Sequence, residues 1–239
     1  MTALPPTPIG RLPVPPGARS ILLVGGTFDP PHTAHVSLAV EAAAVLGLER
    51  LLFIPAARSP HKHAGPEASD RHRIAMLALA LEGVANAGIS TIEIDAAHAA
   101  PGSPSYTVDT LRALSASAPG ASLRLLIGAD QAAAFHLWRE PREVIALAEP
   151  VVALRAPHQT ADLLLAAMAP HWPASDLDAW RKRILGLPTV DISATAARDI
   201  LRTQGPDSPA LAGLLHPAVR EYIRVNRLYG PPAPHRAPA

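Results

Sequence analysis

The chain has 239 residues, of which 49% are hydrophobic and 17% are charged, and its 21 Lys and Arg residues nearly balance 20 Asp and Glu residues. These values exclude disorder along the whole chain, and they leave no net positive field for binding nucleic acid or an acidic membrane surface. The absence of cysteine excludes disulfides, thiolate metal sites and thiol catalysis.

Proline marks both ends of the chain. Six of the 27 prolines fall in residues 1–19 and four in residues 230–239. This predicts two extended or disordered tails around a single domain at residues 20–229. We expect no membrane span, because no stretch reaches roughly 18 uninterrupted apolar residues, and no secretory signal peptide. A cytoplasmic location is therefore the expectation.

Between the tails, short β-type runs alternate with helical patterns. Strands are predicted at residues 21–24, 50–54, 89–94, 123–127, 151–154 and 189–192. Helices are predicted at residues 35–46, 70–81, 107–116, 141–148, 194–202 and 217–227, with Asp70 as one N-cap and Gly47 as one C-cap. Residues 157–187 read as helical with proline breaks.

Alternation of this kind predicts an α/β fold with one doubly wound, mainly parallel sheet. In such sheets ligands bind beyond the carboxyl ends of the strands, where the strand order reverses. The informative residues should therefore come directly after strands.

The strongest candidate is the segment GGTFDPPHTAH at residues 25–35, which follows the first strand and leads into the first helix. Gly25 and Gly26 let the backbone approach a ligand closely. His32 and His35 are three residues apart, so their imidazoles share one face of a helical turn. That turn also offers unpaired N–H groups and a positive dipole end, which suit phosphate oxygens. A plain strand-to-helix linker and a metal-binding pair of histidines are the alternatives.

This segment resembles the GTFDPxHxGH loop of the nucleotidyltransferase superfamily. Further segments occur in the order and spacing of the bacterial nicotinate-nucleotide adenylyltransferases, and the resemblance covers residues 20–229. These segments are SPHK at residues 59–62, SYTVDTL at 105–111, GAD at 128–130 and DISATAAR at 191–198. The resemblance departs at Ala34 and Ala194, where the family has glycine and serine. It implies a Rossmann-like nucleotidyltransferase fold.

The resemblance also implies a reaction, the transfer of AMP from ATP to nicotinate mononucleotide with release of pyrophosphate. It assigns catalytic roles at the phosphates to His32, His35, Lys62 and Arg198. Mg²⁺ would be bound mainly through the ATP phosphates, with no metal site built by the protein. The ATP-binding residues it implies are Gly25, Gly26, Thr27, Phe28, His35, Asp130, Ser193, Thr195 and Arg198.

The second substrate is expected across the sheet. The resemblance places the pyridine carboxyl group near Thr107, the pyridine ring against Trp138 and a phosphate contact at Lys62, and it implies Tyr106 as a further substrate-binding residue. For Tyr106, Thr107 and Asp130 the alternative is a helix cap, for Trp138 it is core packing, and for Arg198 a solvated charge on a helix.

Other functions remain open at this point. Nicotinamide mononucleotide or phosphopantetheine could replace the acid substrate, and a class I aminoacyl-tRNA synthetase shares the histidine motif. A catalytically silent nucleotide-binding protein is an alternative of a different class. The sequence leaves open whether the chain forms homo-oligomers.

Overall fold

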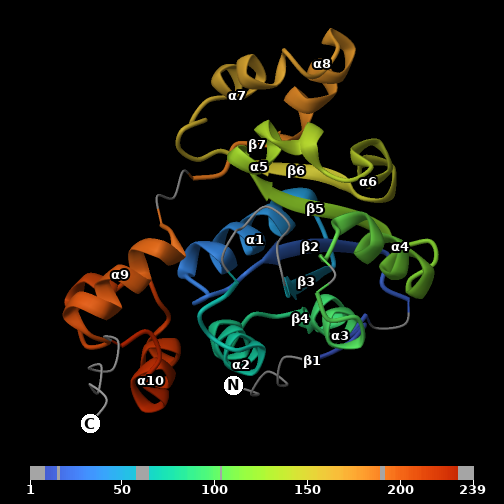
Figure 1. The fold of residues 1–239 in the computed structure, drawn as a ribbon. Coiled ribbons are helices and arrows are strands. Elements are labelled where there is room, and N and C mark those ends of the chain that lie inside the picture. The colour runs from blue at the N-terminus through green and yellow to red at the C-terminus, as the bar shows by residue number, and fades with distance from the viewer. Residues whose placement is uncertain (1–8, 15–16, 58–64, 103, 189–191, 231–239) are drawn as a thin grey trace.

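The computed structural model of the chain describes residues 9–14, 17–57, 65–102, 104–188 and 192–230. One parallel sheet of seven strands lies at its centre (Figure 1). The strands are β1 (Ile9–Gly10), β2 (Ser20–Gly26), β3 (Arg50–Pro55), β4 (Ala87–Ser90), β5 (Ser122–Gly128), β6 (Glu149–Ala153) and β7 (Ile184–Leu185). Their spatial order is β1-β4-β3-β2-β5-β6-β7, which confirms the predicted α/β class and parallel sheet.

Strand β2 is buried on both faces. Ile21 and Leu23 belong to an apolar layer with helices α4 (Thr107–Ser117) and α6 (Pro141–Leu147). Leu22 and Val24 belong to the opposite layer, which includes α1 (Thr33–Leu46) and α2 (Asp70–Ala80). Successive side chains of a strand point to opposite faces, so burial on both sides requires the continuous apolar run seen in the sequence.

The chain reverses direction across the sheet between β2 and β5. From β2 it proceeds outward through β3 and β4, and it then returns to β5, which pairs with the other edge of β2. The residues after β2 and after β5 therefore meet at the carboxyl edge of neighbouring strands. This edge is the expected ligand position in a doubly wound sheet.

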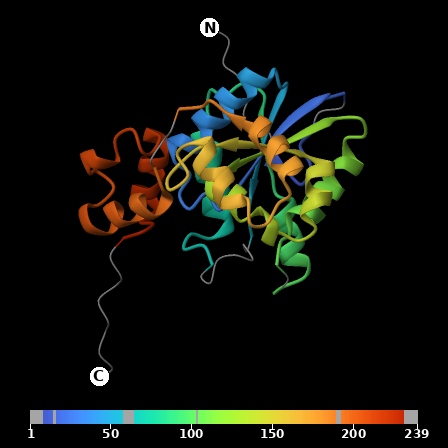
Figure 2. The ribbon, with the colours of Figure 1, turned by 90° about the horizontal axis from the view of Figure 1, so that it is seen from above.

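Two helical groups flank the sheet. Helices α7 (Ala161–Met168) and α8 (Ala174–Arg183) confirm the prediction of helices with proline breaks within residues 157–187, except that Ile184 and Leu185 form strand β7. Helices α9 (Ala194–Gln204) and α10 (Pro217–Asn226) pack with α2 through an apolar cluster that includes Met76, Leu201 and Ile223. Figure 2 shows this C-terminal group beside the sheet.

The prediction of a strand over residues 89–94 is wrong after Ser90. Strand β4 ends there, and helix α3 (Ile92–Ala99) begins almost at once. The buried Ser90 hydroxyl accepts a hydrogen bond from the Ile92 amide at 3.3 Å and donates one to the Arg11 carbonyl at 2.5 Å. A side chain that satisfies local backbone groups in this way competes with continuation of the strand.

The domain begins earlier than residue 20, so the prediction of a tail is wrong for residues 9–14. Strand β1 pairs with β4, and Leu12 and Val14 pack on the core. A smaller correction concerns α2, whose N-cap is Ser69 and not Asp70, because the Ser69 hydroxyl accepts from the His72 amide. The predicted strand at residues 189–192 lies outside the described residues apart from Ile192.

None of the helices in the described parts of the chain combines the length and apolar character needed to cross a membrane. This agrees with the sequence, in which charged residues and prolines interrupt every apolar stretch.

Glu93 of α3 is a mostly buried acid, and its burial raises its pKa to about 7 despite a hydrogen bond from Thr110 and the nearby charge of Arg73. An acid whose pKa rises on folding destabilises the fold as the pH increases from its unfolded value of about 4.5 through 7. We expect the change in unfolding free energy caused by Glu93→Gln to be more favourable at pH 8 than at pH 5, by on the order of 2–3 kcal/mol. Urea unfolding at both pH values measures this, with Glu82→Gln as an exposed control. An equal effect at both pH values contradicts the prediction.

Candidate active site

The loop between β2 and α1 is shaped around the ring of Phe28, whose backbone has a positive φ of 51°. A Cβ atom on Gly26 would lie 3.0 Å from this ring, so the glycine makes room for it. By contrast, a Cβ on Gly25 would meet no atom within 4 Å, and this residue faces open space. Phe28 is only 1% exposed, so its side chain packs inside the loop, and its role in binding ATP stays a prediction.

His32 and His35 lie together at the start of α1. Their rings stack with 3.5 Å between centroids. The Phe28 ring makes a T-shaped contact with the His35 ring, with 4.9 Å between centroids. The His32 amide donates to Nδ1 of His35 at 3.1 Å, so a neutral His35 carries its proton on Nε2. The predicted shared face of the two imidazoles is confirmed.

His32 is the N-cap of α1 and is 7% exposed. Burial, together with the positive charge of Arg155, lowers its pKa to about 4, so the ring is neutral at pH 7. Its Nδ1 atom is buried and has no hydrogen-bond partner among the described residues. In the neutral tautomer that carries its proton on Nδ1, this nitrogen can donate a hydrogen bond to an incoming anionic group at the helix N-terminus.

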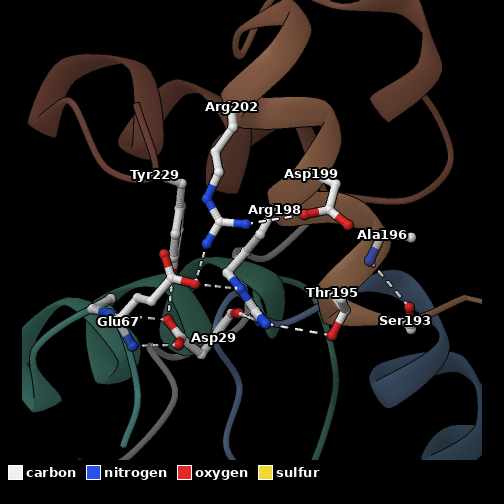
Figure 3. A network of polar contacts seen from close by, with 10 residues as sticks. Asp29, Glu67, Ser193, Thr195, Ala196, Arg198, Asp199, Arg202 and Tyr229 are labelled. Carbon is white, nitrogen blue, oxygen red and sulfur yellow. Dashed lines mark hydrogen bonds and ion pairs between the residues drawn. The ribbon is translucent and has the colours of Figure 1, made fainter. Parts of the chain in front are cut away.

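Arg198 reaches the same loop from α9 (Figure 3). Its Nη1 donates to the Asp29 carbonyl at 2.7 Å, its Nη2 donates to the Thr195 hydroxyl at 3.3 Å, and its Nε lies 2.8 Å from Oε1 of Glu67. These three contacts fix the plane of the guanidinium group. The alternative of a solvated charge is therefore wrong, because the Arg198 side chain is 20% exposed and tied to the loop.

The hydroxyl groups at the start of α9 have local roles. Ser193 is the N-cap, and its Oγ accepts from the Ala196 amide at 3.1 Å. Thr195 accepts from Arg198. In this structure both side chains order the helix start and its arginine. A role of Ser193 and Thr195 in binding ATP stays a prediction.

A buried carboxylate locks the loop to distant parts of the chain. Asp29 is 3% exposed, and it accepts hydrogen bonds from the amides of Glu67 and Ala68 at 2.7 and 3.1 Å and from the Tyr229 hydroxyl at 2.6 Å. Burial raises the pKa of Tyr229, which keeps this hydroxyl a donor. Sequence reasoning missed this residue, although Asp29 lies inside the motif that it singled out.

The residues after β5 and β6 form a second charged group. Arg155 donates two hydrogen bonds of 2.6 Å to Asp130, one to each carboxylate oxygen. Burial alone would raise the pKa of Asp130, but the Arg155 contacts and the backbone amides of Gln131 and Asp130 together outweigh it and lower that pKa. The helix-cap alternative for Asp130 is wrong, because the N-cap of helix α5 (Ala129–Ala133) is Gly128, and Asp130 forms a bidentate ion pair at the sheet edge where the strand order reverses. Sequence reasoning missed Arg155, which no recognised motif contained.

Gly128 lies next to this ion pair, and its lack of a side chain leaves space for the Arg155 and Asp130 side chains. A Cβ on Gly128 would lie 2.7 Å from both Nε of Arg155 and Oδ1 of Asp130. Because both atoms belong to movable side chains, we expect Gly128→Ala to displace the pair without unfolding the protein. The KM for ATP should rise about tenfold, the scale of one lost charge-assisted hydrogen bond. Steady-state kinetics measure this, and Gly186→Ala, where an added Cβ meets nothing within 4 Å, is the control. Equal KM values in the two variants would contradict the expected role.

The segments expected to bind the mononucleotide are brought together. Tyr106 is the N-cap of α4, and the guanidinium of Arg139 lies 4.7 Å from the centre of its ring. Next to Arg139, the indole of Trp138 stacks on Phe135 at 4.6 Å between centroids and remains partly exposed. Trp138 is thus anchored in the core on one side, so the core-packing alternative is correct for that side. A stacking role for Trp138 and a carboxyl contact at Thr107 stay predictions.

Lys62 lies outside the described residues. Among the residues that the structure does describe, no group of three His, Asp or Glu side chains has the arrangement of a metal site. The two stacked histidines, with one ring nitrogen already accepting from the backbone, are also not arranged as chelating ligands.

Comparison with known proteins identifies the family. Residues 23–200 match the cytidylyltransferase-like family model. A probable nicotinate-nucleotide adenylyltransferase of Laribacter hongkongensis is 38% identical over 242 residues, covering 98% of this chain and all of the relative. One of Chromobacterium violaceum is 38% identical over 213 residues, covering 86% of this chain and 96% of the relative.

Solved structures share the fold. The nicotinic acid mononucleotide adenylyltransferase of Plasmodium falciparum, complexed with NaAD, has a TM-score of 0.68 and 17% identity, and the match covers 88% of this chain and 97% of that one. At this identity the likeness shows the fold alone, and it confirms the expected nucleotidyltransferase architecture. The sequence relatives carry the assignment further: the chain belongs to the nicotinate-nucleotide adenylyltransferases within the cytidylyltransferase-like family.

Proposed function

We propose that the protein transfers the adenylyl group of ATP to nicotinate mononucleotide, giving deamido-NAD and pyrophosphate in NAD biosynthesis. The observation that carries this proposal is the loop after β2. It joins a stacked histidine pair at a helix N-terminus to an arginine held by the Asp29 carbonyl, at the sheet edge where ligands bind. The membership of the family and the names of the relatives support the choice of substrate.

The chemistry requires no nucleophile from the protein. An oxygen of the mononucleotide 5′-phosphate attacks the α-phosphorus of ATP and forms the new P–O bond. The bond from the α-phosphorus to the bridging oxygen breaks, and pyrophosphate leaves with that electron pair. The protein contributes alignment and charge stabilisation, the main contributions in phosphoryl and nucleotidyl transfer. This agrees with a chain that has no cysteine.

His32, His35 and Arg198 would hold the phosphate oxygens. Arg198 has five N–H groups, and its hydrogen bonds to the Asp29 carbonyl and the Thr195 hydroxyl use two of them. The planar guanidinium thus keeps further N–H groups with which it would donate to phosphate oxygens. Lys62 is proposed as a further phosphate contact.

Mg²⁺ is proposed as the cofactor, and when bound it would neutralise charge on the triphosphate. The side chains at the loop are hydrogen-bond donors, which fit phosphate oxygens and not a cation. The carboxylate of the loop, Asp29, already accepts three hydrogen bonds. The ion would therefore be held mainly by phosphates and water.

The mononucleotide is proposed to lie beside Tyr106, Thr107 and Trp138. The Arg139 guanidinium at Tyr106 also pairs with Asp109 at 3.9 Å and Glu140 at 3.6 Å, so the choice of a pyridine that carries a carboxylate rests on the relatives and not on this charge. A cytoplasmic location and the absence of nucleic-acid partners belong to the same proposal, because both substrates are small metabolites.

The test is a side-by-side assay with ATP, Mg²⁺ and one of three acceptors: the acid mononucleotide, the amide mononucleotide or phosphopantetheine. Pyrophosphate release is followed continuously, and the dinucleotide is identified by mass spectrometry. We expect turnover with both mononucleotides and a higher kcat/KM for the acid. A higher kcat/KM for the amide or for phosphopantetheine would identify that compound as the substrate in place of the acid. No turnover with any of them would favour the catalytically silent nucleotide-binding protein.

A further inference from the structure

Arg73 is a fully buried arginine that lies outside the proposed phosphate contacts. It belongs to α2, and its side chain has an exposed fraction of 0%. Its Nη1 donates to the backbone carbonyl of Thr27 at 2.6 Å, which is in the loop between β2 and α1. Its Nη2 donates to Oδ1 of Asp70 at 2.6 Å. A buried guanidinium is therefore hydrogen-bonded directly to the backbone of the loop.

Burying a permanent charge is costly unless it is paired and hydrogen-bonded. Arg73 meets this condition only in part, since its Nε is buried without a hydrogen-bond partner among the described residues. A well-packed apolar side chain at such a position is often no less stabilising than a charged one. A contribution to stability is therefore a weak explanation for an arginine at this position. The short hydrogen bond that Arg73 donates to the Thr27 carbonyl explains the arginine better.

The surroundings of Arg73 connect the two halves of the site. Asp70 bridges it to Nε2 of His98 in α3, at 3.0 Å. Glu93 of α3, close enough for the charge of Arg73 to act on it, accepts a 3.1 Å hydrogen bond from the Thr110 hydroxyl. Thr110 lies one turn into α4, whose first residues are the proposed mononucleotide contacts.

We propose that Arg73 is a positioning residue for adenylyl transfer, which sets the backbone of residues 25–28 through the Thr27 carbonyl so that the loop receives ATP in a fixed orientation. This inference rests on the proposed function. Arg73 touches neither substrate. It acts through the loop, where a displacement of about 1 Å can lower a rate by roughly 10²-fold.

The main test uses Arg73→Lys and Arg73→Met. Lysine keeps the charge but has no planar fork, so it cannot serve Thr27 and Asp70 with the same geometry. We expect Arg73→Lys to keep a melting temperature near that of the wild type, while kcat/KM for ATP falls about tenfold or more and the KM for the mononucleotide changes less. Arg50→Met, which removes a partly exposed arginine bonded to Asn86 at 2.8 Å, is the matched control.

A second measurement separates this inference from the proposed function. Calorimetric binding of a non-hydrolysable ATP analogue does not depend on turnover, and we expect weaker binding by Arg73→Lys than by the wild type. Inactive wild-type protein would contradict the proposed function and leave this comparison intact. Unchanged ATP kinetics and analogue binding in a folded Arg73→Lys variant would overturn the inference.

Asp70→Asn covers the case in which both Arg73 variants fail to fold. It leaves Arg73 in place and removes only the charge of its partner, which is 32% exposed in its side chain. We expect about a threefold loss in kcat/KM for ATP, since one anchor of the guanidinium weakens while the Thr27 contact remains. Full activity of Asp70→Asn together with unfolded Arg73 variants would show a purely structural role and overturn the inference.

Discussion

Replacement of Arg198 by alanine is expected to lower kcat about 10³-fold, the scale of losing an arginine that stabilises charge during phosphoryl transfer. The reason lies in its fixed orientation. Glu67, the Asp29 carbonyl and Thr195 hold the guanidinium, so no ordering is needed when the triphosphate arrives. Arg198→Lys should recover only part of the rate, because an ammonium group lacks the planar fork. Pre-steady-state measurement of pyrophosphate formation gives the rate of the chemical step.

Arg202 offers a matched control for Arg198. It lies one turn later on the same helix and also pairs with Glu67, but its other partner is Asp199 on the helix itself (Figure 3). Arg202→Ala removes the same charge and disturbs the same carboxylate, without a contact to the loop. We expect its kcat to stay within about threefold of the wild type. Similar losses in both variants would mean that the network around Glu67, and not Arg198 itself, supports catalysis.

Much of the fold could be predicted because its signals are local. A continuous apolar run such as Ile21 to Val24, ended by two glycines, predicts a strand buried on both faces without knowledge of its neighbours. The His32 and His35 pair was also recognisable from its spacing of three residues, which brings an N-cap and the third residue of the helix together. These features depend on residues within a few positions of one another.

The missed features depend on distant residues. Asp29 is held by Tyr229, 200 positions later, and Asp130 is held by Arg155, which follows a different strand. No local pattern marks either partner. Strand β1 was missed because it has only two residues and lies in a proline-rich segment, where composition predicts a tail. The chain after Ser90 was misjudged because alternating isoleucines suit a strand, while a hydroxyl that bonds backbone groups ends it.

His35 has two separable roles, and two substitutions distinguish them. At the third position of α1, its Nδ1 accepts from the His32 amide, a place that glutamine or glutamate often takes in helix caps. Its Nε2 is the donor proposed for the phosphate oxygens. His35→Ala removes both roles, whereas His35→Gln can keep the bond to the backbone and removes the imidazole.

We expect both variants to lower kcat by about 10²-fold or more, the scale of losing one preorganised donor to a developing charge. Only alanine should also lower the unfolding free energy, by about 1 kcal/mol, the usual contribution of a cap. Single-turnover kinetics and urea unfolding measure the two effects, with His171→Ala, a histidine stacked on His136 in another part of the chain, as the control. A nearly active His35→Gln would assign His35 to the cap alone, and the phosphate contact would then fall to His32, whose buried Nδ1 has no partner among the described residues.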